Sequence, residues 1–340
     1  MPNCGSQCYL CDYPIRFDTY KGCSHGCKYC FIQKNGKAKL GNIKPNESVK
    51  TLSNFINGQR NKETMWADWN IPLHWGGMSD PFQPVEREYK RSFECLKLFA
   101  ETKYPFIVST KGRLAAESEY LEVLKDCNCV FQVSAVCSKY DSLELGAPAF
   151  DERLKMMKKI APNVKRLIVR AQPYMHEVFD DVCLNLAKIR DAGAYGIIIE
   201  GMKFFTYKKG LVKIGGDFTY PYKLIREDFL KIKEKSHSLG LKIFAGENRI
   251  RELGDSLSCC GAEGVPGFVG NKFNLNHIIH GEKPESTEMQ KAMGSAECFT
   301  AIYQDTIESR RVRKTSFYEE MLHYYKTREK VVKTVFGIIH

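Results

Sequence analysis

The 340-residue sequence lacks long apolar runs, and nowhere does it approach the roughly 18 consecutive apolar residues of a membrane-spanning helix. Residues 1–5 have neither the basic start nor the apolar stretch of a signal peptide. Low-complexity tracts are absent as well. These absences predict a globular protein of the cytoplasm with no membrane partner.

Acidic residues are in deficit, with 40 Asp and Glu against 51 Lys and Arg, which gives a net charge of +11. A basic excess is compatible with a polyanionic partner such as nucleic acid, although it also simply keeps a protein soluble. The chain has 14 cysteines. Without a secretory signal, they argue against a disulfide framework and for metal or thiol chemistry in a reducing compartment.

Two cysteine triplets share the spacing Cys-x3-Cys-x2-Cys: first Cys4, Cys8 and Cys11, then Cys23, Cys27 and Cys30. A cubane iron–sulfur cluster has four irons, so three thiolates leave one iron open to an outside ligand. Zinc loops more usually pair Cys-x2-Cys with a second pair or with His. A strand-like run, residues 15–20, precedes only the second triplet, and the aromatic Tyr29 stands just before its last cysteine. We therefore predict a [4Fe–4S] cluster at the second triplet.

The first triplet needs a fourth ligand, and the adjacent pair Cys259 and Cys260 offers one. We predict a metal site from Cys4, Cys8, Cys11 and Cys260, which would hold an auxiliary iron–sulfur cluster or zinc. The alternative is an idle, flexible tail. Because the side chains of adjacent residues diverge, we expect only one of the paired cysteines to bind. His25, inside the second triplet, could hydrogen-bond to the cluster, but exposure to solvent is favoured.

Short apolar runs alternate with helical segments along most of the chain. Predicted strands cover 71–75, 106–110, 130–136, 166–171, 196–200 and 241–245, and predicted helices cover 48–57, 86–102, 115–125, 151–160, 179–192 and 226–239. With the strand before Cys23, this pattern indicates βα units around a parallel sheet of about six to seven strands. Periodicity alone does not separate a doubly wound sheet from an incomplete (β/α) barrel. We expect an N-terminal Cys-rich segment (1–14), the α/β domain (15–252), and a loop-rich, then helical extension (253–340).

The second triplet, with Tyr29 in its x2 gap, resembles the signature of the radical S-adenosylmethionine (radical SAM) enzymes. Residues 77–86, with their Ser-Asp-Pro run, resemble a second-strand motif of the spore photoproduct lyase-like branch. The resemblance implies a partial (β/α)6 barrel whose cluster loop follows the first strand. It also implies that the open iron binds S-adenosylmethionine and that an electron, from a donor such as flavodoxin or ferredoxin, cleaves it to methionine and a 5′-deoxyadenosyl radical.

Matching positions in that branch imply contacts with S-adenosylmethionine. These cofactor-binding candidates are Gly76, Gly77, Ser79, Lys111, Ser134 and Arg153. Spore photoproduct lyases place a hydrogen-donating cysteine where this sequence has Gly77, so splitting of thymine dimers is disfavoured. Cys137, with Tyr140 nearby, is our candidate catalytic hydrogen donor, and the alternative for Cys137 is a buried packing residue.

The sequence thus predicts a radical SAM enzyme that abstracts hydrogen from a substrate at the mouth of the barrel. The substrate could be a nucleic acid or nucleotide, and a small molecule or peptide is equally compatible. The cofactor could instead serve a methyltransferase reaction. The rival class is a non-enzymatic iron–sulfur or zinc protein that binds nucleic acid.

Overall fold

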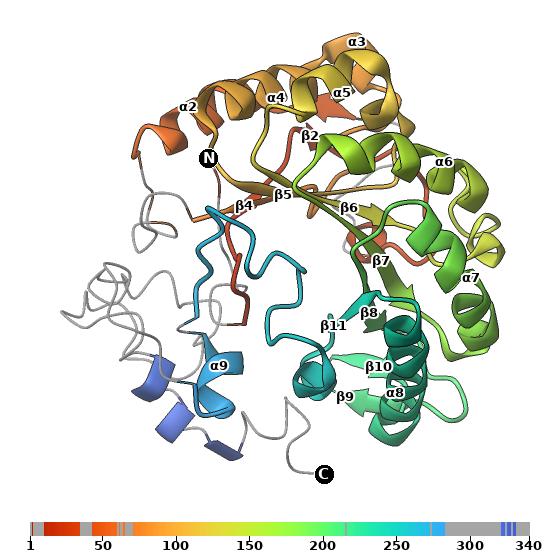
Figure 1. The fold of residues 1–340 in the computed structure, drawn as a ribbon. Coiled ribbons are helices and arrows are strands. Elements are labelled where there is room, and N and C mark those ends of the chain that lie inside the picture. The colour runs from red at the N-terminus through yellow and green to blue at the C-terminus, as the bar shows by residue number, and fades with distance from the viewer. Residues whose placement is uncertain are drawn as a thin grey trace.

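A seven-stranded, wholly parallel sheet organises the chain (Figure 1). The computed structural model describes residues 2, 10–34, 43–59, 61, 64, 71–214, 216–272, 274–282, 321–323, 325–327 and 329–330. In spatial order the strands are β1 (Arg16–Phe17), β4 (Leu73–Trp75), β5 (Phe106–Thr110), β6 (Cys129–Ser134), β7 (Arg166–Tyr174), β8 (Gly196–Gly201) and β11 (Lys242–Ala245). Within the described ranges no pairing joins β1 to β11, so the sheet curves without closing.

Helices cover the outer face of the curved sheet, as Figure 1 shows. They are α2 (Ser48–Ile56), α3 (Glu86–Tyr89), α4 (Arg91–Thr102), α5 (Ser118–Leu124), α6 (Phe150–Ile160), α7 (Phe179–Asp191) and α8 (Tyr222–Ser238). Outward-facing strand residues such as Trp75, Phe106 and Phe131 pack with the buried faces of these helices into the main hydrophobic core. The short helices α1 (Phe31–Lys34) and α9 (Leu275–Ile279) lie away from this layer.

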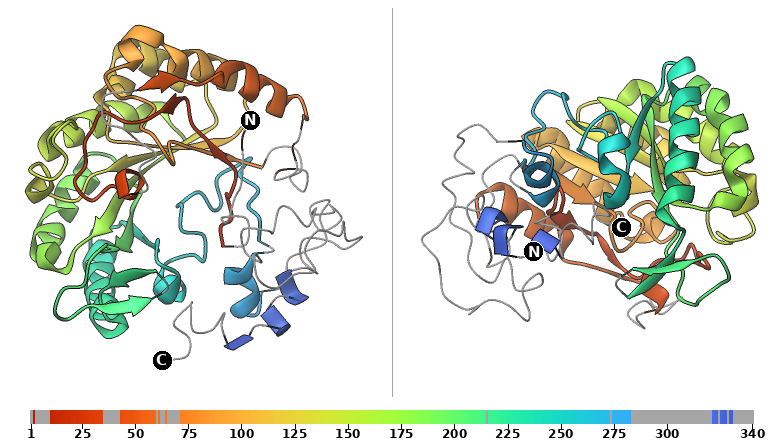
Figure 2. Two further views of the ribbon diagram at one scale, coloured as in Figure 1. Left: turned by 180° about the vertical axis from the view of Figure 1, so that it is seen from behind. Right: turned by 90° about the horizontal axis from the view of Figure 1, so that it is seen from below.

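The inner face of the sheet carries a second, smaller core. Alternate residues of parallel strands share a face, and Ile107, Val130, Ile168, Ile198 and Phe244 form an apolar layer here. Two segments fill the enclosed space against it. They are residues 11–13 before β1 and residues 259–268 after β11. Figure 2 shows from behind how the chain after β11 turns back into the concave side of the sheet.

The seven strands and their alternation with helices confirm the predicted fold class, an incomplete (β/α) barrel. The predicted helix 86–102 is broken, because Lys90 adopts a left-handed backbone (φ 52°) between α3 and α4. The predicted strand 15–20 is also split. Only β1 joins the sheet, and β2 (Tyr20–Lys21) instead pairs antiparallel with β3 (Lys44–Pro45).

The sequence analysis missed a small hairpin, β9 (Val212–Ile214) and β10 (Asp217–Thr219), inserted between β8 and α8. Most of the predicted helical extension lies outside the described residues, and residues 321–323, 325–327 and 329–330 are helical as expected. The three predicted domain boundaries stay predictions. Among the described residues no helix has the length and apolar character to cross a membrane.

Candidate active site

The second cysteine triplet lies on a loop that leaves the carboxyl end of the first strand. This segment, residues 22–30 and here called the cysteine loop, follows β1 and β2 and leads into α1. Cys23, Cys27 and Cys30 are half-buried and free of disulfides. Burial raises the pKa of Cys23 to about 12 and also raises that of Cys27. The loop therefore presents three unmodified thiols at the mouth of the barrel, where βα loops gather.

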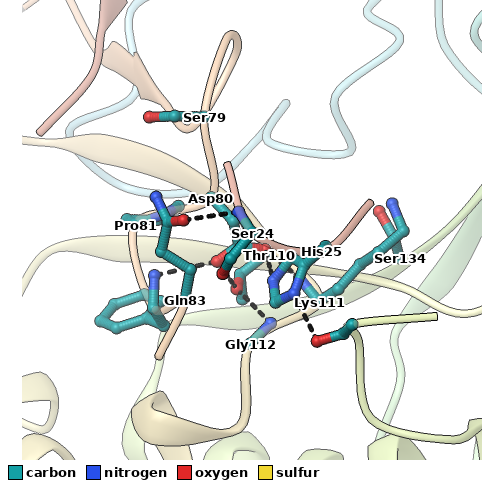
Figure 3. A network of polar contacts seen from close by, with 12 residues as sticks. Ser24, His25, Ser79, Asp80, Pro81, Gln83, Thr110, Lys111, Gly112 and Ser134 are labelled. Carbon is teal, nitrogen blue, oxygen red and sulfur yellow. Dashed lines mark hydrogen bonds and ion pairs between the residues drawn. The ribbon is translucent and has the colours of Figure 1, made fainter. Parts of the chain in front are cut away.

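His25 anchors the cysteine loop from beneath (Figure 3). Its Nδ1 lies 2.9 Å from the carbonyl oxygen of Gly146, and its Nε2 lies 3.0 Å from Oδ2 of Asp80. The side chain is buried, with 2% of the residue exposed. The expectation of an exposed His25 is therefore wrong, because the Asp80 carboxylate and the Gly146 carbonyl, from two other loops, lie against its ring.

Asp80 is the hub of this network (Figure 3). Its Oδ1 accepts hydrogen bonds from Thr110 Oγ1 at 2.7 Å and from the Phe82 amide at 2.9 Å, and its Oδ2 accepts from the Lys111 amide at 2.6 Å. Burial alone would raise the pKa of Asp80, but the attraction of His25 and these donors hold it at about 2. The carboxylate thus ties the cysteine loop to the ends of β4 and β5.

Two further contacts fix the backbone of the cysteine loop. Gln83 receives the Ser24 amide on its Oε1 at 2.9 Å and donates from Nε2 to the Gly22 carbonyl at 3.1 Å. On the opposite side, the Gly146 amide donates to the His25 carbonyl at 2.8 Å. A Cβ at Gly146 would collide with the Ser24 carbonyl oxygen and lie 2.9 Å from His25 Cα. The loop therefore fits only against glycine at this position.

A buried ion pair holds the other end of the cysteine loop. The Tyr29 hydroxyl donates to Glu144, which also pairs with Arg153. Arg153 donates in addition to the Ser134 and Pro148 carbonyls, each at 2.7 Å. Lys111 Nζ lies 3.8 Å from Glu144. Three of the predicted cofactor-binding residues, Lys111, Ser134 and Arg153, are thus neighbours around Glu144, which the sequence analysis did not single out.

The other three cofactor-binding candidates lie together at the end of β4. Ser79 donates from Oγ to the Tyr20 carbonyl at 2.8 Å and from its amide to Asp18 Oδ1 at 3.0 Å. Gly76 has φ 89°, and a Cβ there would collide with a carbonyl oxygen of β5. Gly77 has room for a side chain, since its nearest neighbour would be Arg16 Cδ at 3.5 Å. Burial raises the pKa of Asp18 to about 6 despite the two amide donors. Figure 3 shows Ser79 standing apart from the Asp80 network.

A polar row crosses the inner face of the sheet, one step closer to the mouth than the apolar layer. It consists of His74, Ser109, Gln132 and Arg170 from β4 to β7. His74 Nε2 lies 3.1 Å from Ser109 Oγ, which donates to Gln132 Oε1 at 2.8 Å, and Arg170 Nη1 donates to the same oxygen at 2.7 Å. Burial, with Arg170 nearby, lowers the pKa of His74 well below its usual range. A row filled for stability alone would be aliphatic, whereas these side chains form a hydrogen-bonded polar network.

The catalytic candidates lie in the main core. Cys137 is 1% exposed among apolar side chains. The Tyr140 hydroxyl donates to the Pro173 carbonyl at 2.7 Å, and its ring packs edge-on against Tyr29 at 6.1 Å between centroids. These surroundings suit the packing alternative for Cys137, and the catalytic roles stay predictions.

Three other cysteines meet inside the barrel. The thiols of Cys11, Cys259 and Cys260 all lie within 4.8 Å of one another. The two adjacent thiols are 3.7 Å apart, so the expectation that their side chains diverge is wrong. Hydrogen bonding from Cys11 and Cys260, together with Arg251, lowers the pKa of Cys259 well below its usual range, whereas that of Cys11 rises to about 12. Of the predicted first-triplet ligands, Cys4 and Cys8 lie outside the described residues.

Comparison with known proteins places the fold. No protein-family model matches the chain. An uncharacterised protein of Mycobacterium tuberculosis is 24% identical over 205 residues, or 56% of this chain and 59% of the relative, and one of Mycobacterium bovis matches equally. The chain thus spans about three fifths of the length of these curated relatives.

Among solved structures, a spore photoproduct lyase mutant superposes with a TM-score of 0.53 at 16% identity, covering 68% of this chain and 76% of that one. A spore photoproduct lyase complexed with dinucleoside spore photoproduct gives the same values. The chain has the partial (β/α)-barrel fold of the radical SAM type. The likeness confirms the predicted fold.

Proposed function

We propose that this protein is a radical SAM enzyme that cleaves S-adenosylmethionine reductively and abstracts hydrogen from a substrate at the barrel mouth. The observation that carries the proposal is the cysteine loop itself. It presents Cys23, Cys27 and Cys30 just after the first strand, and His25 and Gly146 hold its backbone against two other mouth loops.

The residues present fit a [4Fe–4S] cluster. The three thiols form no disulfide and are half-buried, and soft thiolates are the ligands that iron–sulfur clusters take. When bound, the cluster and S-adenosylmethionine supply the electron and the 5′-deoxyadenosyl radical.

The chain's own residues would bind, orient and shield S-adenosylmethionine. Lys111 places an ammonium near Cys27 and Glu144, where it offsets negative charge at the cysteine loop and can receive a carboxylate. Gly77 leaves backbone open beside Ser79 for the amino acid part of the cofactor, and Gly76 lets the chain pass close to the Ser109 carbonyl so that this turn can form. The polar row beneath offers hydrogen-bond donors and acceptors. The lowered pKa of His74 keeps its imidazole uncharged at neutral pH. The fit of these positions supports their proposed role in cofactor binding.

For the substrate we propose a nucleic acid or nucleotide. The segment between β8 and β10 follows a strand end, so it lies with the mouth loops. It carries four exposed lysines, Lys203, Lys208, Lys209 and Lys213. Tyr207 in the same segment is 63% exposed. Lysines attract phosphates, and exposed aromatic rings stack on bases. This segment and the net charge of +11 therefore both favour a polyanionic substrate.

The proposal is tested by anaerobic reconstitution with iron and sulfide, reduction with dithionite in place of flavodoxin or ferredoxin, and assay of 5′-deoxyadenosine. We expect product from the wild type and none above background from Cys27→Ala. Cys183→Ala is the matched control, since Cys183 is a half-buried thiol outside both cysteine groups. An intact cluster that yields no 5′-deoxyadenosine contradicts the proposal, and S-adenosylhomocysteine as the product would indicate methyl transfer instead.

The substrate class is tested separately. Lys208→Glu with Lys209→Glu should weaken binding of single-stranded DNA by about tenfold or more in low salt. The reason is that the variant neutralises fewer phosphates and its binding therefore releases fewer counterions. Lys158→Glu with Lys159→Glu makes the same charge change on exposed positions of α6. Equal losses in both variants would show that net charge alone, and not the hairpin, attracts the DNA.

A further inference from the structure

The three thiols inside the barrel form a compact, buried donor set, here called the buried thiol group. Cys11 and Cys260 are buried, Cys259 is half-buried, and all three sulfurs lie within 4.8 Å of one another. Cys259 Sγ and Cys260 Sγ are 3.7 Å apart. Cys11 precedes β1, and the other two follow β11, so folding brings together residues from opposite ends of the barrel. Such convergence of thiols needs a physical reason beyond local packing.

We propose that Cys11, Cys259 and Cys260 bind a single Zn²⁺ ion at a site separate from the cysteine loop. Four tetrahedral ligands at the usual Zn–S distance of about 2.3 Å would stand about 3.8 Å apart. The observed separation of the two adjacent thiols is close to that edge length. A cubane cluster would place each thiolate on a different iron and would need thiols that lie farther apart. Soft thiolates select zinc over hard cations such as Mg²⁺ or Ca²⁺.

The backbone around the buried thiol group is fixed on both sides. Next to Cys11, Asp12 accepts hydrogen bonds from Asn274 Nδ2 and from His277 Nε2, each at 2.9 Å. The Cys260 carbonyl accepts from Gln132 Nε2 at 2.8 Å. Figure 1 shows the segment before β1 running beside the chain that leads into α9. These contacts hold the two segments that carry the three thiols.

The surroundings suit an anionic zinc–thiolate centre. Apolar side chains, Phe244, Val265 and Phe268 among them, exclude water from it. The buried Arg251 lies beside Cys259, and its Nε has no hydrogen-bond partner within the described ranges. A guanidinium there offsets the negative charge that three thiolates leave on Zn²⁺, which reduces the cost of burying it.

Binding involves no redox change. Each thiol that becomes a ligand releases its proton to solvent and forms a Zn–S bond, and the three thiolates fill three of the four tetrahedral positions. The ion would join the segment before β1 to the segment after β11, the two edge strands of the open sheet. We therefore assign the ion a structural role. It would link the two sides of the inner core, where the edge strands β1 and β11 do not pair with each other.

The first test is the zinc content of the full chain expressed with zinc in the medium. We expect about one zinc per chain in the wild type and in Cys23→Ala/Cys27→Ala/Cys30→Ala, and about a tenfold loss in Cys11→Ser/Cys259→Ser/Cys260→Ser. Cys183→Ser should keep its zinc, because that thiol is remote from the group. Zinc retained by the variant that lacks the buried thiol group overturns the proposal.

The second test does not depend on the folding of a variant. Metal-free wild type titrated with Co²⁺ should develop thiolate-to-cobalt charge-transfer absorption and the visible bands of a tetrahedral site, saturating at about one Co²⁺ per chain. Absence of these bands, or a disulfide between Cys259 and Cys260 in their place, overturns the proposal. So does iron that persists in the variant lacking Cys23, Cys27 and Cys30, which would mean a second iron–sulfur cluster. None of these outcomes alters the 5′-deoxyadenosine assay, so the two proposals fail independently.

Discussion

The two groups of cysteines in this barrel are held in opposite ways. Cys23, Cys27 and Cys30 lie close in sequence on a half-exposed loop, and polar contacts through His25 and Asp80 position the loop's backbone. The buried thiol group is assembled from distant segments inside an apolar layer.

The difference shows two ways of preparing a site. The cysteine loop leaves its thiols half-exposed, as the proposed cluster requires, since it must receive an electron and an outside ligand. The buried thiol group instead is shut in by side chains such as Phe244 and Phe268, as suits an ion that only holds segments together. If this contrast is right, changes at one group should leave the metal of the other untouched.

The largest expected effect comes from Gly146→Val. Any Cβ at this position collides with the Ser24 carbonyl oxygen, so the loop must move away from the α6 side. Forced overpacking of this kind costs about 1–3 kcal/mol or more. We expect iron uptake to fall at least about tenfold, with zinc content unchanged. The same substitution at Gly216, where a Cβ meets nothing within 4 Å, is the control, and normal iron uptake by Gly146→Val would contradict the contact.

The next effect is that of Asp80→Asn. The pKa of Asp80 is held at about 2 by His25 and by amide and hydroxyl donors, which outweigh its burial. A depressed carboxyl pKa stabilises the fold above its unfolded value near 3.8, and that stabilisation is lost as pH falls through about 2. The neutral amide lacks this contribution at every pH. It also places an NH₂ group near a hydrogen-bond donor such as the Lys111 amide. Because this weakens the support of the cysteine loop, we expect iron affinity to fall by about 10–100-fold.

The control for this prediction is the pH dependence of unfolding in metal-free protein. The difference in unfolding free energy between wild type and Asp80→Asn should be largest above about pH 4 and should shrink as pH falls from about 4 to about 2. A difference that vanishes near neutral pH would show that Asp80 is not the charged anchor of His25.

A smaller effect on the other group is expected from Arg251→Gln. The guanidinium lies beside Cys259 and has no equally placed substitute in glutamine. Loss of a supporting group around metal ligands lowers affinity by about 10–100-fold, and we expect the low end because Arg16 also acts on Cys11. Competition with a chromogenic zinc chelator measures the change. A parallel loss of iron would break the independence of the two groups.

The smallest effect should follow Cys137→Ala. The thiol is buried in the main core and contacts neither cysteine group through any hydrogen bond described here. We expect 5′-deoxyadenosine formation without substrate at about the wild-type rate, with a stability loss of about 1 kcal/mol from the small cavity. A marked fall in product formation at unchanged iron content would favour the catalytic role of Cys137 over the packing alternative.

Local patterns made much of this architecture predictable. Apolar runs followed by helical segments gave the strands around Phe106, Val130 and Ile197, because parallel strands buried on both faces show little else. The cysteine loop was found from its spacing together with the strand-like run before it and Tyr29 before its last cysteine. The helix break at Lys90 was missed, since no glycine or proline marks it. The hairpin after β8 was missed although its sequence has Gly215-Gly216 between the two strands, a hairpin signal that was overlooked.

The supporting residues of the site were harder to foresee. Glu144 and Gly146 lie in a loop that nothing in the sequence connects with Tyr29 or Ser24. The meeting of Cys11 with both Cys259 and Cys260 depends on the chain re-entering the barrel after β11, which periodicity does not reveal. Contacts between distant segments come from topology, and a single sequence carries no direct record of them.

The central claim is that Cys23, Cys27 and Cys30 hold a cluster with one iron open to S-adenosylmethionine. Electron paramagnetic resonance of the anaerobically reconstituted, dithionite-reduced protein, with and without S-adenosylmethionine, tests it most directly. The account predicts the signal of a reduced [4Fe–4S] cluster whose shape changes when S-adenosylmethionine is added, and no such signal in Cys27→Ala. A cluster signal that S-adenosylmethionine leaves unchanged would contradict it.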